Sequence, residues 1–306
     1  MLEVYNINWT GEKDTAVALG YFDGVHTAHQ YLIRQMCDYA ARHSLDKAVF
    51  TFTKSIKLGH KGKDILTQSQ KLDCMRRMGI DLFYSPDFFD FSSLTPEEFV
   101  CDILIKSMRA KAVFCGENFF FGKDRRGNVQ VLKQLCEKYN LEFVQAQTFC
   151  MNGEVVSSTA IRAALADGNI EKANAMLGRP YGVNLNVVHG KKIGRTIGTP
   201  TINQIYPAGM CTPKDGVYIT CTTVNGKKYP SATGFGSRPT VNGVGKTCET
   251  YILGFEGDLY YQNIQVDFYS YLFETRKFDS LEQLGAMIRD SAEKAKIYLH
   301  KLGVIK

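Results

Sequence analysis

Residues 20–29 have the sequence GYFDGVHTAH, and this stretch indicates the fold more strongly than any other in the chain. An apolar run at residues 16–19 precedes it and predicts a buried strand, and residues 30–44 follow it with apolar side chains at helical spacing. His26 and His29 therefore lie where a strand turns into a helix. At that end of an open α/β sheet ligands bind, and a helix N-terminus favours anions. The stretch thus predicts chemistry on a nucleotide phosphate.

Length and composition limit the class of protein. The chain has 306 residues, which suits two domains, and its 44% hydrophobic residues are enough for proper cores. The net charge of +6 is modest and spread along the chain, so we expect no nucleic-acid partner. Nine cysteines, an odd number without a CxxC pair, predict reduced thiols rather than disulfides or zinc. With neither a signal peptide nor a membrane span in the sequence, we expect a cytoplasmic monomer or weak homo-oligomer that binds no membrane.

The first 180 residues or so alternate short apolar runs with helical patterns, which predicts a parallel sheet with helices on both faces. The predicted strands are residues 16–19, 48–52, 82–84, 111–114 and 141–144. One helix start is marked by Thr95 as N-cap, Pro96 at the first position and Glu98 closing a capping box.

From about Tyr181 the pattern changes to closely spaced strands of period two, broken by Gly, Asn and Pro. The Asn225-Gly226 pair is a hairpin signal, and the absence of helices between the strands predicts a small antiparallel barrel. A terminal helix is predicted from Ser280, with a capping box between Ser280 and Gln283. Its apolar stripe is Leu281, Leu284, Ile288 and Ala295. We place the domains at residues 1–181 and 182–306.

Three segments of the first half resemble one family. Residues 20–29 resemble GxFDGVHxGH, residues 116–127 resemble GxDFxFGxxRxG, and residues 157–162 match SSTxIR. These are signatures of the bacterial bifunctional riboflavin kinase/FAD synthetases, whose N-terminal domain is a Rossmann-like nucleotidyltransferase of the HxGH type. The resemblance implies that His26 and His29 stabilise the α-phosphate of ATP while AMP is transferred to FMN. It further implies that these residues bind ATP and its phosphates: Gly20, Phe22, Asp23, Gly24, Asn118, Arg125, Ser158, Thr159 and Arg162.

The second half carries the other signature of that family. Residues 190–203 resemble the flavokinase motif GxxxGRxxGFPTxN, and the segments around residues 213–218 and 236–240 resemble PxxGVY and GxRPT. By resemblance Glu249 is the general base, and Thr201 and Asn203 hold Mg²⁺. ATP is expected at Gly190, Gly194, Arg195, Gly198 and Thr201, and the flavin at Arg238, Thr240 and Phe273.

The chain departs from the family in both halves. Ala28 stands in place of a glycine, Asn118 in place of an aspartate, and residues 51–56 lack the family's Pro-His-Pro. Phe273 and Thr275 replace an arginine and a glutamate, and Thr199 replaces a phenylalanine.

The resulting prediction is an enzyme that phosphorylates riboflavin to FMN and adenylylates FMN to FAD, with ATP as substrate and Mg²⁺ as cofactor. Two alternatives stay open: a riboflavin kinase with a degenerate adenylyltransferase domain, and a non-catalytic flavin or nucleotide sensor. A different adenylyltransferase fused to a barrel is disfavoured, because both family signatures are present.

Overall fold

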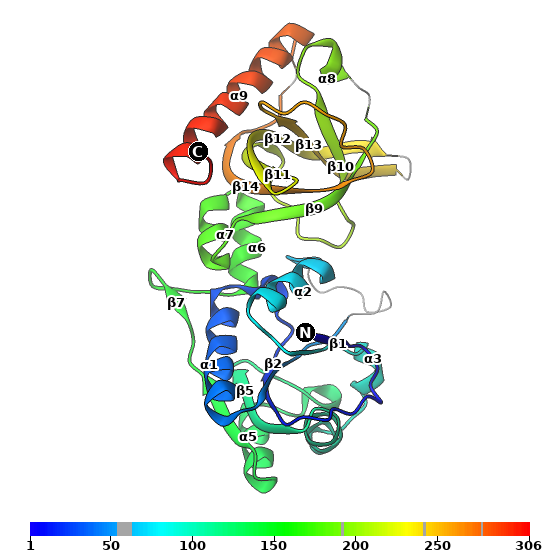
Figure 1. Cartoon of the computed structure of the whole chain (residues 1–306), viewed down its shortest axis with the longest axis vertical. Helices are drawn as coiled ribbons and strands as arrows, with labels where there is room; N and C mark the ends of the chain where they lie inside the picture. Colours follow the sequence, from blue (N-terminus) through cyan, green and yellow to red (C-terminus); the bar gives the residue numbers. More distant parts are fainter. Residues whose placement is uncertain (54–62, 191–192, 241–242, 277) are drawn as a thin grey trace. The chain divides into compact units, whose positions relative to one another are not determined.

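The computed structural model of the chain describes residues 1–306 except 54–62, 191–192, 241–242 and 277 (Figure 1). The chain divides into two compact units, one of residues 1–62 and 66–157, the other of residues 63–65 and 158–306. The helices α6 (Ser158–Asp167) and α7 (Ile170–Leu177) belong to the second unit. The boundary predicted at 181–182 concerns the functional domains and stays a prediction.

The first unit is built on a six-stranded sheet in the order β1-β4-β3-β2-β5-β6, in which every neighbouring pair is parallel. In chain order the strands are β1 (Leu2–Val4), β2 (Thr15–Leu19), β3 (Asp46–Phe50), β4 (Leu82–Tyr84), β5 (Ala110–Gly116) and β6 (Glu142–Ala146). All five predicted runs form strands, although β3 begins and ends two residues earlier than predicted. The edge strand β1 was not predicted, because it is three residues long and buries only Val4.

Helices cover both faces of this sheet. The helices α1 (Thr27–His43) and α2 (Gln68–Arg77) pack on the face that carries Ala16 and Ala18 of β2. The π-helix η2 (Phe99–Ser107) and α5 (Val129–Lys138) pack on the face that carries Val17 and Leu19. Smaller elements complete the unit: α3 (Phe88–Phe91), α4 (Pro96–Glu98) and the hairpin β7 (Cys150–Met151) with β8 (Glu154–Val155). The alternation along β2 confirms the predicted α/β class.

The helix start predicted at Thr95 is confirmed. Thr95 Oγ1 accepts a hydrogen bond from Glu98 N at 3.2 Å, and Glu98 Oε2 accepts one from Thr95 N at 2.7 Å. We therefore expect Thr95→Ala to lower the stability of the first unit by about 1 kcal/mol, which corresponds to a loss of about 2–4 °C in its thermal midpoint. Differential scanning calorimetry measures this. Thr10→Ala, at an exposed position, is the control, and equal midpoints for the two variants would show that the cap does not stabilise the unit.

The second unit is a closed antiparallel barrel in the order β10-β13-β12-β11-β14-β9, which confirms the predicted architecture. In chain order its elements are β9 (Tyr181–Val188), α8 (Ile193–Thr196), β10 (Thr201–Ile205), β11 (Gly216–Val224), β12 (Lys227–Thr240), β13 (Gly243–Ile252) and β14 (Asn263–Phe273). Asn225 and Gly226 connect β11 to β12 with φ of 49° and 77°, as a type I′ hairpin requires.

The terminal helix α9 (Leu281–Lys301) lies along the barrel (Figure 1). Ser280 caps it by accepting a bond from Gln283 N at 3.2 Å, but Gln283 Oε1 accepts from Asp279 N, so the reciprocal bond of the predicted capping box is not formed. Ala295 is buried as predicted, whereas Leu281 is 48% exposed, so the predicted stripe was wrong at its first residue. Among the described residues, no helix has the length and hydropathy needed to span a membrane.

Candidate active sites

The turn between β2 and α1 holds its backbone in strained conformations. Phe22 has φ 54° and Val25 has φ 40°, both in the left-handed region, and Gly24 between them has φ 81°. A bulky or β-branched residue is rarely found there, and such strain persists only where the surrounding structure enforces it. The turn therefore concentrates backbone strain where the sequence predicts phosphate binding. Gly20 and Asp23, which are predicted to bind ATP, lie in this turn.

Two imidazole rings stack at the start of α1. His26 is the N-cap, and its Nδ1 accepts a hydrogen bond from His29 N at 3.3 Å. The two rings lie 3.6 Å apart with an interplanar angle of 16°. Burial lowers the pKa of His29 well below its usual range, and the neighbouring His26 and Lys71 act in the same direction. His29 is therefore neutral at neutral pH, and its buried Nδ1 has no hydrogen-bond partner among the described residues.

Ala28 lies in the first turn of α1, which begins three residues earlier than the helical pattern predicts. Its φ is not positive, so the backbone there needs no glycine. Alanine is the most favourable residue in a helix. The methyl group at this departure from the family pattern therefore costs nothing in backbone conformation.

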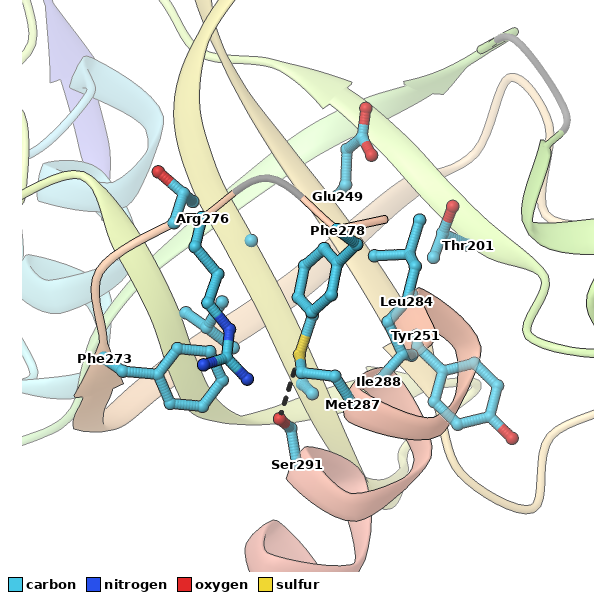
Figure 2. A pocket seen from close by; sticks show the side chains of 14 residues that line it. Thr201, Glu249, Tyr251, Phe273, Arg276, Phe278, Leu284, Met287, Ile288 and Ser291 are labelled. Carbon is cyan, nitrogen blue, oxygen red and sulfur yellow. Dashed lines mark hydrogen bonds between the residues drawn. The ribbon is translucent and has the colours of Figure 1, made fainter. Parts of the chain in front are cut away.

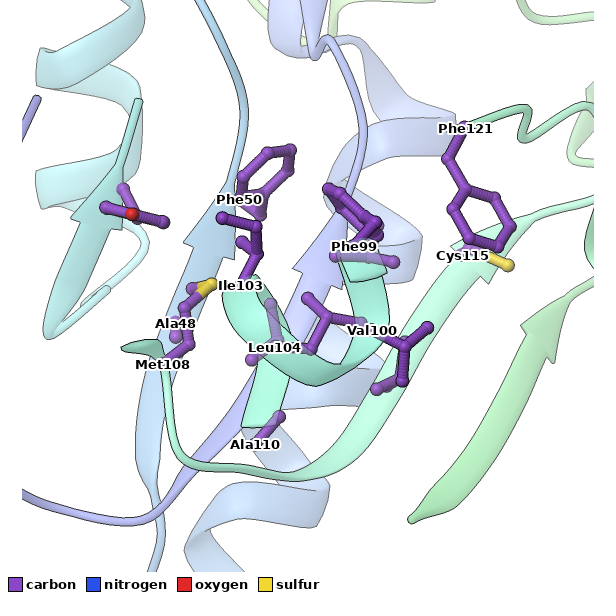
Figure 3. Close-up of a cluster of buried hydrophobic side chains, with 14 of the residues drawn as sticks. Ala48, Phe50, Phe99, Val100, Ile103, Leu104, Met108, Ala110, Cys115 and Phe121 are labelled. Atoms are coloured by element: carbon purple, nitrogen blue, oxygen red, sulfur yellow. The ribbon is translucent and has the colours of Figure 1, made fainter. Parts of the chain in front are cut away.

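A cavity of about 600 Å³ with aromatic walls lies in the same unit. Its lining residues are Tyr21, Phe50, Phe52, Phe88, Phe91, Ser92, Phe99, Asn118, Phe119, Phe120, Phe121, Gly122, Asp124 and Arg125. Phe50, Phe99 and Phe121 also belong to the buried cluster beneath η2 (Figure 3), so the floor of the cavity is continuous with the core. We name this cavity the aromatic pocket. Its size and lining suit a flat aromatic ligand.

The aromatic pocket includes Asn118 and Arg125, whose predicted role in binding ATP stays a prediction. Both residues line it, beside the short helix η3 (Lys123–Arg125). The Arg125 guanidinium lies 4.5 Å from the ring centroid of Phe120, a cation–π contact. The pocket as a whole was missed by sequence reasoning, which treats a run such as FFFG as core. The available signal was the recurrence of phenylalanine at residues 88–91 and 119–121.

The third predicted phosphate-binding segment lies at the start of α6, in the second unit. Ser158 begins the helix, Thr159 is exposed, and Arg162 donates from Nε to the carbonyl of Lys63 at 2.8 Å. Their approach to the two histidines stays a prediction. The segment that lacks Pro-His-Pro lies outside the described residues from residue 54 onward.

The glycine-rich segment of the barrel leads from β9 to β10, and its residues 191–192 lie outside the described part of the chain. A Cβ on Gly190 would lie 2.5 Å from the amide nitrogen of Asn203, and one on Gly194 would lie 2.3 Å from the carbonyl of Thr199. Gly198 has φ 68°. Gly190 and Gly194 thus leave no room for a side chain, because other atoms of the protein lie close to their backbone. Gly198 is favoured for a different reason, its left-handed backbone conformation.

A cavity of about 310 Å³ lies between the barrel wall and α9, and we name it the apolar cavity. Its walls include Phe273, Phe278, Leu284, Met287 and Ile288. In Figure 2 the carboxylate of Glu249 and the hydroxyl of Thr201 lie on one side of the cavity, away from Met287 and Ser291. Strand register explains why the polar groups meet, because Asn203 pairs with Glu249 and Thr201 with Tyr251. Phe273, predicted to bind the flavin, lines this cavity, and its role stays a prediction.

The barrel has a second cavity of about 270 Å³, which we name the polar cavity. Its lining includes Arg195, Glu256, Asp258 and Tyr260. Arg195 donates to the Tyr260 hydroxyl at 3.3 Å. Thr201 lines both cavities. We name the region around this shared lining residue the junction.

Arg238 and Thr240, predicted to bind flavin, lie on β12 opposite Gly245 and Gly243 of β13. Their side chains are outside the described part of the structure. Their role stays a prediction.

Imidazoles at a strained strand-to-helix turn, together with a barrel whose two cavities share a threonine in their lining, fit a nucleotide-dependent transferase with two sites. The family model for FAD synthetase matches residues 10–160, and that for riboflavin kinase matches residues 177–299. The chain belongs to the family of bifunctional riboflavin kinase/FMN adenylyltransferases.

Individual relatives agree over nearly the whole length. The chain is 32% identical over 291 residues to the bifunctional riboflavin kinase/FMN adenylyltransferase of Escherichia coli strain K12, covering 93% of each chain. It is 32% identical to the protein of that name from Bacillus subtilis strain 168, covering 95% of this chain and 94% of the relative. A crystal structure from Streptococcus pneumoniae, described as a macrolide-efflux protein, matches with a TM-score of 0.86 and 31% identity over 96% of this chain and 98% of the other. That structure supports the fold of the whole chain.

Proposed function

We propose that the barrel transfers the γ-phosphate of ATP to riboflavin and that the α/β unit transfers AMP from ATP to the FMN so formed. The first product is FMN with ADP, and the second is FAD with pyrophosphate. The observation that carries the proposal is that Thr201 lines both the apolar and the polar cavity, while Glu249 also lines the apolar one. Family membership supports both activities.

For phosphorylation, the isoalloxazine ring of riboflavin occupies the apolar cavity, and its ribityl chain points toward Glu249 and Thr201. The Glu249 carboxylate accepts the proton of the terminal hydroxyl as that oxygen attacks the γ-phosphorus of ATP. ATP occupies the polar cavity, where Arg195 and Tyr260 lie. The bond from the γ-phosphorus to the bridging oxygen breaks, and ADP leaves.

The residues at the junction fit Mg²⁺. Thr201 and Asn203 lie two residues apart on β10 and so share one face of the strand. The Asn203 amide is held against the backbone of Gly190, where an added Cβ would lie 2.8 Å from Oδ1. Mg²⁺ prefers oxygen ligands and needs few from the protein when phosphates supply the others. Bound there, the ion would neutralise charge on the phosphates of ATP.

For adenylyl transfer, the flavin ring of FMN occupies the aromatic pocket and its phosphate points toward the turn at residues 20–26. An oxygen of that phosphate attacks the α-phosphorus of ATP, and pyrophosphate leaves with the bridging oxygen. His26 and His29 donate hydrogen bonds to the α-phosphate as charge develops there. The family resemblance assigns the departing pyrophosphate to Ser158, Thr159 and Arg162. The low pKa of His29 supports a neutral N–H donor in this role.

Product analysis by chromatography tests both steps. Purified protein receives ATP and Mg²⁺ with riboflavin, and separately with FMN. The proposal predicts FMN from the first incubation and FAD from the second. FMN formed from riboflavin and then left unchanged indicates the kinase-only alternative, which Asn118 favours. Binding of FMN and ATP without any product indicates the sensor.

The aromatic pocket makes a separate prediction. Phe120 is 47% exposed on its wall, so Phe120→Ala removes ring contact with the bound flavin without disturbing the core. Losing one aromatic contact costs about 1–1.5 kcal/mol, so we expect KM for FMN to rise about 5- to 10-fold with little change in kcat. Phe89→Ala is the matched control, because Phe89 is 50% exposed and does not line the pocket. Equal KM values for the two variants would place the flavin elsewhere.

A further inference from the structure

The helix α2 carries a buried lysine beside the two histidines. Lys71 is 4% exposed, which is unusual because lysine is almost never fully buried unless its charge is paired or hydrogen-bonded. Its Nζ donates to the carbonyl of Tyr21 at 2.9 Å and lies 4.3 Å from the centroid of the Tyr21 ring. One side chain thus holds both the peptide and the ring of Tyr21.

Tyr21 connects the two parts of the proposed adenylyltransferase site. Its ring lies 4.9 Å from that of Phe52, and both rings line the aromatic pocket. Its peptide leads directly into Phe22, whose backbone is in the left-handed region and whose ring meets His29 edge-on at 5.2 Å. A shift of the Tyr21 peptide would therefore move the pocket wall and the histidine pair together.

Lys71 is not alone in donating to this carbonyl. Besides Lys71 Nζ, the Thr51 hydroxyl donates to Tyr21 O at 3.0 Å. Thr51 is fully buried directly after β3 and Lys71 lies on α2, so neither donor belongs to the turn itself. A hydrogen bond from a charged donor is stronger than one from a neutral donor. Lys71 is accordingly the stronger of the two constraints on the strained turn.

We propose that Lys71 is a positioning residue for adenylyl transfer, which fixes the Tyr21 peptide so that the aromatic pocket and the histidine pair keep their mutual geometry. The inference rests on the adenylyl transfer proposed above and adds to it a residue outside the family motifs quoted. Strained backbone persists where its surroundings over-determine it, and Lys71 supplies that constraint here. The same ammonium, after burial and His26, helps to keep the pKa of His29 low.

The test compares variants of the full chain in both reactions. Lys71→Met keeps an unbranched side chain, one atom shorter, and removes its donors and charge. We expect kcat for FAD formation to fall about 10- to 100-fold, as misplacement of reacting groups by about 1 Å does, with a higher KM for FMN. Riboflavin phosphorylation should stay at the wild-type rate. Lys71→Arg should recover most of the loss, and Thr51→Val should reproduce it more weakly.

Controls separate positioning from loss of stability. Lys47→Met removes a partly exposed lysine that pairs with Asp81 in the same unit, and it should leave both reactions unchanged. If Lys71→Met does not fold, the test uses Lys71→Arg and Thr51→Val. KM for FMN and kcat for FAD formation are then measured separately for these two variants. A Lys71→Met enzyme that makes FAD at the wild-type rate would overturn the inference while the proposed function stands.

A second readout does not depend on catalysis. In protein labelled with ¹⁵N-histidine, Lys71→Met should shift the imidazole resonances of His26 and His29 and leave those of His189 and His300 in place. If the wild-type protein forms no FAD, the proposed adenylyl transfer is wrong. The histidine resonances then still test whether Lys71 fixes the geometry of His26 and His29. Unchanged His26 and His29 resonances would then contradict the inference.

Discussion

Replacing Glu249 by glutamine is expected to reduce FMN formation from riboflavin by about 10²–10⁴-fold, the range that general acid–base catalysis contributes. Glutamine keeps the shape of the side chain but cannot accept the proton of the attacking hydroxyl. Adenylylation of FMN should continue at the wild-type rate, because Glu249 lies on β13 of the barrel unit and the histidines lie in the other. The two rates are measured in separate incubations by chromatography of the flavins.

The control for this variant is Glu293→Gln, an exposed glutamate on α9 that lines neither barrel cavity. It should phosphorylate riboflavin as the wild type does. If Glu249→Gln also keeps the wild-type rate, the proton is accepted by another group, and the role of Glu249 is wrong.

The second large effect is expected for His29→Ala. Removing one preorganised donor to a developing charge costs about 10²–10³-fold in kcat, so FAD formation from FMN should fall by that factor. Riboflavin phosphorylation should not change. The assay is again chromatography of the flavins, now with FMN as the starting flavin.

His43→Ala serves as the matched control, because His43 lies exposed at the other end of the same helix. It should form FAD as the wild type does. Wild-type FAD formation by His29→Ala would remove this imidazole from the mechanism.

The fold could be predicted from local patterns because each strand and helix carries its own period. The five predicted strands of the sheet and the Asn225-Gly226 hairpin depend on neighbouring residues alone. Details that depend on tertiary packing could not be predicted. Leu281 fits the apolar stripe of α9 by spacing, yet the barrel does not cover it.

For the sites, too, features that are continuous in sequence could be predicted, and features built from distant segments could not. The histidine turn and the glycine-rich segment are continuous in sequence, so their motifs could be found directly. The aromatic pocket draws its walls from four separate segments, near residues 21, 50, 90 and 120, and no local pattern joins them. Lys71 likewise lies about 50 residues from the carbonyl it holds. Burial and one hydrogen bond distinguish it from an ordinary lysine on a helix.

Adenylyl transfer by the α/β unit is the central claim, because Asn118 and the missing Pro-His-Pro depart from the family pattern in that half of the chain. The most direct measurement follows ³²P from ATP into the products. The protein is incubated with FMN, Mg²⁺ and ATP that carries the label at either the α or the γ position. We predict that label from the α position appears in FAD and label from the γ position in pyrophosphate. A parallel kinase assay shows that the protein is active if it converts all the riboflavin. If that active protein transfers no label from α-labelled ATP to FMN, the account is contradicted.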